Sequence, residues 1–182
     1  EKLQAGYRPL LDEKGINYLN RISLASDRLR HLVRDLISLA RISGPVQMVT
    51  QTDLNLLVKE VQVDLEFTIE ETEAVIEVGD LPTLEANSSQ IHQLFQNLIS
   101  NSLKFHKKQT PPRIKVYSQR VDDEFCEIIV KDEGIGFDEA YLEKVFKPFE
   151  RLHSLLDGYT GSGIGLALCR KVAEAHGGTI NA

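Results

Sequence analysis

The chain has 182 residues, of which 42% are hydrophobic and 26% are charged, so it is long enough for one or two domains with a buried core. Its net charge is −6 and its basic residues are scattered, which argues against nucleic acid as a partner. No apolar run approaches the roughly 18 residues that cross a bilayer. We therefore expect a cytoplasmic fragment without membrane contact, and the sequence leaves open whether its parent protein is soluble or membrane-anchored.

The first 44 residues are predicted to be helical. From Leu19 onward, apolar and small residues alternate in steps of three and four, a period typical of helical bundles. These seam positions are Ile22, Ser26, Leu29, Val33, Leu36 and Ala40. We expect residues 7–11 to end a preceding helix, residues 12–15 to form a turn, and Gly44-Pro45 to stop the long helix. So few upstream residues cannot cover the seam, which must pack on missing sequence or on a second copy of the chain; packing on the downstream domain is the alternative.

Strands and helices interleave in the rest of the chain. Strands are expected at 46–50, 74–78, 84–86, 113–121 and 125–131, with another from Thr179, and helices after Asp53 and at 87–108, 138–144 and 164–176. Asp53 is the expected N-cap of its helix, and Asn87 with Gln90 resembles a capping box. The fold class is therefore α+β: an α/β sandwich with helices on one face of a mixed sheet.

Two cysteines are present, Cys126 and Cys169, and both have apolar neighbours in the sequence. No further cysteine lies close enough to either of them to suggest a zinc site. We expect buried free thiols in a reducing compartment.

The helix expected at 87–108 divides its side chains between two faces. At about 100° per residue, the arc expected to face the core holds Ile91, Leu94, Phe95, Leu98, Ser102 and Phe105. Asn97, Asn101 and Lys104 share a second arc about 60° wide. Two amides and an ammonium offer oxygens to a hard cation such as Mg²⁺ and a positive charge to phosphate. Taken alone, the same pattern is also typical of a solvated helix face.

Two glycine-rich segments are candidates for backbone contact with a ligand. In the first, Asp132 precedes Gly134 and Gly136 at a strand end, where a carboxylate can accept a hydrogen bond from the adenine amine. The second opens the last helix with free backbone amides that can cradle phosphate, and consists of Gly161, Ser162, Gly163, Ile164, Gly165 and Leu166. It is neither a Walker loop nor a Rossmann turn, because it lacks the lysine and follows a loop. Either segment alone is also compatible with an ordinary turn.

Residues 97–105, 132–136, 146–149 and 161–166 occur in the order of four known motifs: an asparagine box, a first glycine box, a phenylalanine box and a second glycine box. The chain thus resembles the catalytic ATP-binding domain of sensor histidine kinases, and phytochrome-like kinases in particular. These belong to the superfamily shared with gyrase, heat-shock-chaperone and mismatch-repair ATPases. The resemblance covers about residues 50–182 and implies a Bergerat-type ATP-binding fold, here without its last strand.

The upstream helix resembles the second helix of the dimerisation and histidine-phosphotransfer hairpin in the same family. The resemblance therefore implies two domains. Residues 1–44 would be a partial hairpin, with the end of its first helix, a turn and its second helix, and residues 45–182 the catalytic domain. It also implies a homodimer formed through the hairpin and a response-regulator receiver domain as partner.

ATP and Mg²⁺ are the ligands that the resemblance implies. Asn101 would hold Mg²⁺, with Asn97 supporting the metal or the phosphates. Lys104 would contact phosphate, Phe105 would lie beside the base, and Asp132 would accept the adenine amine. Asn97, Asn101 and Lys104 are the expected catalytic residues.

Glycines would shape the remaining walls of that site. Gly134 and Gly136 would form the adenine wall, and residues 146–163 a lid hinged at Gly161, Gly163 and Gly165. Ser162, Ile164 and Leu166 complete the ATP-binding set in the second glycine box. Arg151 either contacts phosphate or is a solvated lid residue.

A histidine protein kinase is the function that the resemblance implies, with the γ-phosphate passing to a histidine and then to a response-regulator aspartate. The related ATPases carry a water-activating glutamate where this chain has Asn97, which favours transfer over hydrolysis. An ATP-gated switch or an ATPase is the alternative. We expect the acceptor upstream of residue 1, and none of the present histidines to serve, namely His31, His92, His106, His153 and His176.

Overall fold

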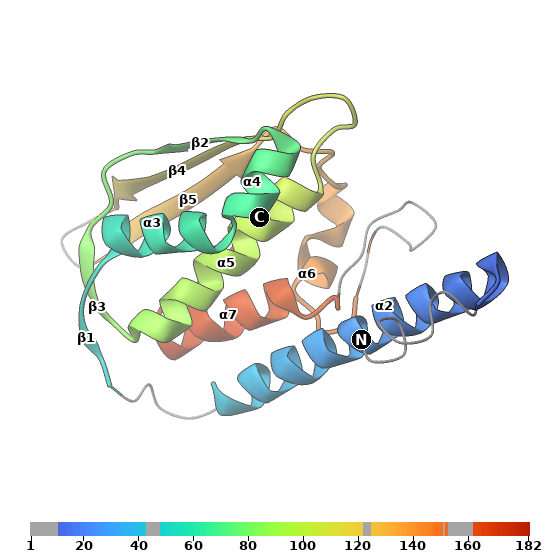
Figure 1. Ribbon diagram of the computed structural model, residues 1–182. Helices are drawn as coiled ribbons and strands as arrows, with labels where there is room; N and C mark the ends of the chain where they lie inside the picture. Colours follow the sequence, from blue (N-terminus) through green and yellow to red (C-terminus); the bar gives the residue numbers. More distant parts are fainter. Residues whose placement is uncertain (1–10, 43–47, 122–124, 151, 153–161) are drawn as a thin grey trace.

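The computed structural model describes residues 11–42, 48–121, 125–150, 152 and 162–182 (Figure 1). Its first helix, α2, spans Glu13–Arg41. The Asp12 carboxylate accepts a hydrogen bond of 2.7 Å from the backbone amide of Gly15 and caps the helix. The turn expected at residues 12–15 is therefore wrong, because this cap starts the helix at Glu13. The expected stop at residues 44–45 lies outside the described residues.

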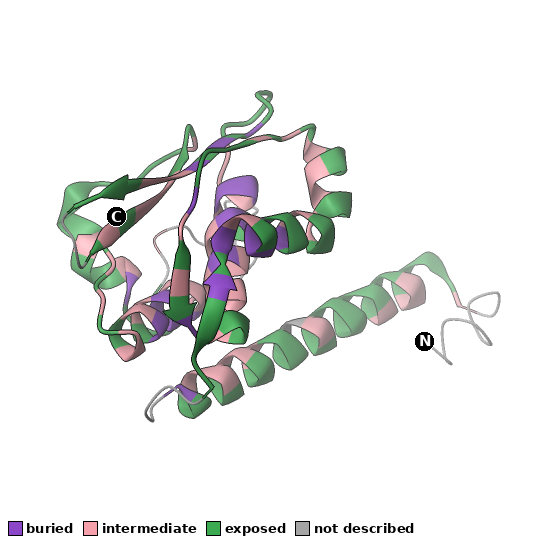
Figure 2. Cartoon of the chain, turned by 90° about the vertical axis from the view of Figure 1, so that its left-hand side faces the viewer, coloured by how far each residue is buried: buried purple, intermediate pink, exposed green. Residues whose placement is uncertain are grey.

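The seam of α2 is exposed to solvent. Ile22 and Leu29 are 60% and 61% exposed, and Val33 and Leu36 are exposed as well. Among the described residues, the apolar contacts between this helix and the α/β unit lie at its end, where Leu39 and the following Ile42 pack against α7 (Gly165–Ala175). Figure 2 shows the helix lying alongside the α/β unit with little buried surface. Packing on the downstream domain thus covers the end of α2 and leaves the seam open.

No helix within the described ranges has the length and apolarity to cross a membrane. The elements after α2 are β1 (Thr50–Asp53), α3 (Leu54–Asp64), α4 (Glu66–Thr72), β2 (Val75–Val78), β3 (Thr83–Ala86), α5 (Ser88–Lys104), β4 (Arg113–Arg120), β5 (Cys126–Asp132), the 3₁₀ turn η2 (Glu139–Tyr141), α6 (Leu142–Val145) and α7. They match the expected order, with three differences. The first strand is Thr50–Asp53 instead of residues 46–50, α4 was not predicted, and residues 179–182 form no strand.

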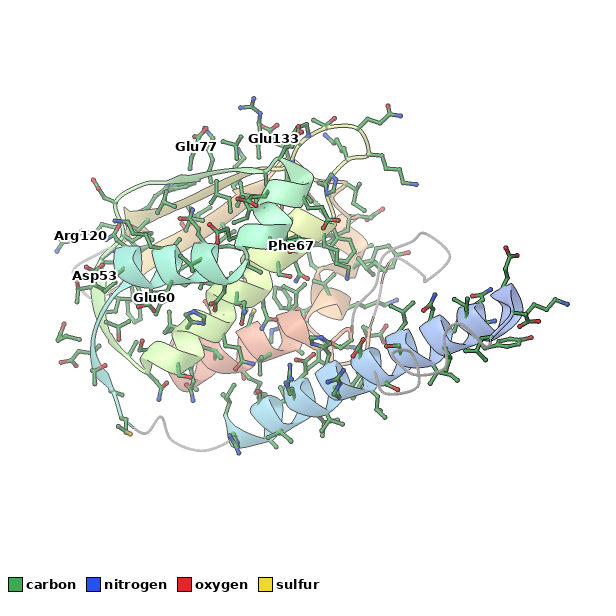
Figure 3. The ribbon with its side chains drawn as sticks, in the orientation of Figure 1. Asp53, Glu60, Phe67, Glu77, Arg120 and Glu133 are labelled. Atoms are coloured by element: carbon green, nitrogen blue, oxygen red, sulfur yellow. The ribbon has the colours of Figure 1, made fainter. Side chains whose placement is uncertain are left out.

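Pairing explains the position of β1. Its residues lie antiparallel to β3, and the buried Thr52 hydroxyl donates to the Ala86 carbonyl oxygen at 3.2 Å. The following residue, Asp53, is the N-cap of α3 as expected and is labelled in Figure 3. Hydrogen bonds from the backbone amides of Asn55 and Leu56 lower the pKa of Asp53. The cap therefore contributes stability above the carboxyl's unfolded pKa, and this contribution is lost as pH falls through the folded value.

The larger sheet has the order β2-β4-β5, with β2 parallel and β5 antiparallel to β4. Ile114 and Val116 of β4 are buried against α3 and α5, whereas Arg113 and Lys115 alternate with them on the other face. Figure 3 shows Glu77, the ion-pair partner of Lys115, on the outer side of the sheet. The expected mixed sheet with helices on one face is confirmed.

Helix α5 packs its apolar face into the centre of the domain. The fully buried residues are Phe95, Ile99 and Leu103, with Ser102 also buried. The core arc is therefore rotated from the expected one, which included Leu98 and Phe105; both are only half-buried.

The start of α5 depends on the far end of the chain. Asn87 is its N-cap and accepts a 3.1 Å hydrogen bond from the Gln90 amide. The reciprocal half of a capping box is not made, because the Asn87 amide donates instead to Nε2 of His176 at 3.1 Å. His176 Nδ1 lies 2.8 Å from the Val172 carbonyl oxygen, so the neutral ring bridges α7 to α5. This bridge fixes the two helices side by side.

The two cysteines differ in burial. Cys169 on α7 is fully buried, and burial raises the pKa of its thiol to about 12. Cys126, at the start of β5, is only half-buried, so the expectation of a buried thiol is correct for Cys169 alone. Both are free.

A thiol-specific disulfide reagent should therefore distinguish them. At mildly alkaline pH we expect the folded protein to react through Cys126 only, because the Cys169 thiol is both inaccessible and protonated. Mass spectrometry of labelled peptides measures this. In Cys126→Ser the folded protein should remain unlabelled, and denaturant should expose Cys169; rapid labelling of Cys169 in the folded variant would contradict the buried α5–α7 contact.

Candidate functional site

The polar arc of α5 is available at the surface of the domain. Asn97, Asn101 and Lys104 are all half-buried and follow one another at steps of four and three along one side of the helix. The Lys104 ammonium lies 4.2 Å from the centroid of the Phe105 ring. The predicted alignment of these residues on one helix face is thus present.

The acidic turn after β5 is tied directly to α5. Ser102 Oγ donates to Asp132 Oδ2 at 2.8 Å, and the Gly134 amide donates to Asp132 Oδ1 at 2.8 Å. The Ile135 amide donates to the Phe105 carbonyl oxygen at 2.9 Å. Each carboxylate oxygen keeps a free lone pair, so Asp132, which is exposed, can still accept a hydrogen bond from a ligand.

Ser102 is a candidate site residue that the sequence did not reveal. The sequence placed it only on the helix arc expected to face the core. The structure gives its hydroxyl a specific task, which is to orient the Asp132 carboxylate. A buried serine in an otherwise apolar arc was the one available signal, since a buried hydroxyl needs a hydrogen-bond partner.

Gly134 has no room for a side chain. A Cβ at this position would lie 2.7 Å from Asp132 Oδ1 and 2.7 Å from the Phe105 carbonyl oxygen. Gly136 adopts φ 61°, a left-handed conformation that glycine adopts at no steric cost, and has open space around it. The expected requirement for glycine thus has a different cause at each position.

The second glycine segment lies against the other end of the α5 arc. A Cβ on Gly165 would lie 3.2 Å from Asn97 Oδ1, so α7 begins in close contact with that amide. Gly163 has φ 73°, and its carbonyl oxygen accepts from the Phe149 amide at 2.9 Å. Ile164 is buried, and Leu166 half-buried. Gly161 and Arg151 lie outside the described residues.

Ser162 makes a contact that the sequence did not predict. Its hydroxyl donates to Asp35 Oδ2 of α2 at 2.7 Å and accepts from the Ile164 amide at 3.2 Å. A cleft of about 470 Å³ lies between α2 and α5 beside this contact. Its lining comprises His31, Arg34, Asp35, Ile37, Ser38, Arg41, Leu65, Gln93, Gln96, Asn97 and Ser100. Of the predicted site residues only Asn97 lines the cleft.

The α5 arc is therefore bounded at one end by the acidic turn and at the other by the start of α7. The Asn97 amide nitrogen is buried and has no hydrogen-bond acceptor among the described residues, so it can serve a ligand. The part of the chain that the structure describes contains no cluster of three or more histidine, cysteine or carboxylate residues. A divalent cation here would have to bind an amide oxygen together with ligand oxygens and water, a set that suits Mg²⁺.

A family model for histidine kinase-, DNA gyrase B- and HSP90-like ATPases matches residues 86–182, which include α5, the acidic turn and α7. The chain belongs to this family. The predicted family and fold class are confirmed.

Two relatives illustrate the family match. The phytochrome-like protein Cph1 of Synechocystis sp. is 35% identical over 178 residues, covering 98% of this chain and 23% of the relative. The sensory kinase SasA of Prochlorococcus marinus is 36% identical over 102 residues, covering 56% of this chain and 27% of the relative. The chain thus spans about a quarter of the length of these relatives.

Solved structures agree with this assignment. The catalytic domain of the histidine kinase ThkA superposes with a TM-score of 0.57 at 28% identity, covering 70% of this chain and 81% of that one. Full-length ShkA, solved with AMPPNP, superposes with a TM-score of 0.73 at 22% identity, covering 94% of this chain and 36% of that one. The second likeness extends over α2 and supports the fold.

Gly134→Ala should disturb the acidic turn. The added methyl group must displace a backbone carbonyl, so we expect a loss of about 1–3 kcal/mol in the free energy of unfolding. Chemical denaturation measures it. Gly178→Ala is the matched control, because its Cβ would meet only one atom, at an ordinary 3.5 Å. Equal stability of the two variants would contradict the close packing at Gly134.

Proposed function

We propose that this chain binds Mg-ATP along α5 and is the catalytic core of a sensor histidine kinase. The observation that carries the proposal is the pair of tertiary contacts on one helix: Asp132 is held at Ser102, and Gly165 lies against Asn97. Three motifs distant in sequence therefore border the same polar arc. Family membership and the kinase relatives support the same assignment.

The adenine end of the nucleotide would lie at the acidic turn. Asp132, oriented by Ser102, accepts the hydrogen bond of the adenine amine, which guanine lacks at that position. Gly134 and Gly136 let the backbone approach the base, and Phe105 lies beside it. The Lys104 ammonium lies over the Phe105 ring and would contact the phosphates.

The phosphates would extend along the arc toward the start of α7. Asn101 offers an amide oxygen to Mg²⁺, which would neutralise phosphate charge when bound, and Asn97 supports the metal or the phosphates. The second glycine box, from Gly161 to Leu166, contributes backbone amides and the hinge of a lid over residues 146–163. Within the described ranges, Ser162 already contacts α2 and Gly165 borders Asn97.

Transfer is favoured over hydrolysis because Asn97 cannot act as a base. The only carboxylate among the cleft-lining residues is Asp35, and its Oδ2 is engaged by Ser162. Water is therefore poorly activated, and the γ-phosphate is retained for a histidine acceptor and later for a response-regulator aspartate. An ATP-gated switch or ATPase of the same family is the alternative.

We assign residues 1–44 to a partial dimerisation and phosphotransfer hairpin and residues 45–182 to the catalytic domain. The exposed α2 seam supports a homodimer, because a second copy would bury it. The solved complex of ThkA with the response regulator TrrA supports a receiver domain as partner; that likeness concerns the fold, at 24% identity. A cytoplasmic location agrees with two free thiols.

Asn101→Ala tests the metal assignment. We expect ATP affinity measured by calorimetry with Mg²⁺ to fall at least about tenfold, and affinity without Mg²⁺ to change little, because the lost amide acts through the metal. Asn17→Ala is the matched control, because Asn17 carries an exposed amide near the start of α2. If Asn101→Ala and the wild type bind ATP equally well in the presence of Mg²⁺, Asn101 is not a metal ligand.

Phosphate release separates the kinase from the ATPase alternative. With saturating Mg-ATP, we expect the wild type to release phosphate no faster than the Asn101→Ala variant, because Asn97 cannot activate water. A continuous coupled assay for inorganic phosphate measures it. Sustained turnover by the wild type that disappears in Asn101→Ala would support the ATPase alternative instead.

A further inference from the structure

The two long faces of α2 have different chemistry. At 100° per residue, the seam and the cleft-facing residues point roughly 140° apart. The seam is apolar, whereas the cleft-facing residues include His31, Arg34, Ser38 and Arg41. The cationic face is therefore directed at α5 and away from the surface expected to meet a second copy.

The arginines in the cleft have no ion-pair partner within the part of the chain that the structure describes. No described carboxylate forms a salt bridge with Arg34 or Arg41, and the cleft's single carboxylate, Asp35, is hydrogen-bonded to Ser162. The lining thus carries two guanidinium groups against one carboxylate. An unpaired pair of arginines at the wall of a cleft favours an anion, and the planar guanidinium suits phosphate oxygens.

The wall opposite the arginines supplies donors as well. Gln93 and Gln96 carry side-chain amides, and Ser100 carries a hydroxyl. Asn97 adds its buried amide nitrogen, which has no acceptor among the described residues. An anion in this cleft would therefore be met by charged donors from α2 and neutral donors from α5.

The same α5 face runs on to the proposed nucleotide site. Asn97 lines the cleft, and Asn101 and Lys104 follow it on the same side of the helix. From Phe105, beside the base, to Asn97 the helix rises about 12 Å. A nucleoside triphosphate extended along this line has its base at Asp132 and its terminal phosphate at the mouth of the cleft.

We propose that Arg34 and Arg41 of α2 bind the terminal phosphate of the nucleotide in the cleft between α2 and α5. This inference rests on the proposed function, because it requires the base to bind at the acidic turn. In addition, α2, which lies outside the α/β unit, would complete the nucleotide site. The two arginines would then distinguish ATP from ADP.

Calorimetric titrations of the whole chain with ATP and with ADP test this proposal. We expect the Arg34→Gln, Arg41→Gln double variant to bind ATP at least about tenfold more weakly, with ADP affinity unchanged within about twofold. Arg21→Gln is the matched control, an exposed arginine of α2 that does not line the cleft, and should behave as the wild type. Thermal unfolding checks that every variant is folded.

Three results would overturn the proposal. Equal losses for ATP and ADP would mean that the arginines do not select the terminal phosphate, and unchanged ATP binding would mean that they do not contact it. In a third arm, the wild type is titrated with inorganic phosphate. If only phosphate binding depends on the two arginines, the cleft holds a free anion and the nucleotide assignment fails.

The same data separate this inference from the proposed function. If the wild type binds ATP and Asn101→Ala weakens that binding, the function stands even when the arginine variants have no effect. If the wild type binds no ATP, both are refuted. Selective loss of ATP affinity in the double variant supports the cleft as the terminal-phosphate site.

Discussion

The hydrogen bond from Ser102 to Asp132 connects the two halves of the site. One partner belongs to α5 and the other to the end of β5, so the bond fixes the acidic turn against the helix. Together with the Ile135 amide on the Phe105 carbonyl, it leaves no space for a Cβ at Gly134. The position of the carboxylate, and therefore the proposed recognition of a base, depends on this small network and on the packing that holds α5 in place.

That packing makes α5 both a core element and a site element. Phe95, Ile99 and Leu103 are buried against the sheet and α3, while the opposite polar arc stays accessible. Burial of such side chains typically contributes about 1.5–3 kcal/mol each, which is enough to hold the helix in a fixed orientation. The geometry of the candidate ligand-binding arc is therefore set by the core. On its other side, α5 is held by α7 and the His176 bridge.

Much of this arrangement could be predicted from the sequence because the signals were local. Asp53 as a cap, the β4–β5 hairpin and the asparagine arc follow from capping chemistry and helical or strand periodicity, and the structure has all three. The failures involved tertiary partners. The second hydrogen bond of the capping box at Asn87 is replaced by one to His176, 89 positions away. Ser102 donates its hydrogen bond to Asp132, 30 positions away. No local pattern reports such pairs.

The contacts of α2 follow the same logic. Its seam was recognisable from period alone, yet its cleft-facing residues resembled an ordinary solvated surface. Their neighbours distinguish them from such a surface. Ser162, the first described residue of the second glycine segment, donates a hydrogen bond to Asp35, and Asn97 lines the same cleft as the two arginines. Within the described residues, this helix meets the proposed nucleotide site through a hydrogen bond and charged side chains, and meets the core through Leu39 and the following Ile42. It can therefore separate from the domain at little cost in buried apolar surface. The proposed phosphoryl transfer between domains requires that kind of contact, because the helical hairpin must approach the phosphate and afterwards release it.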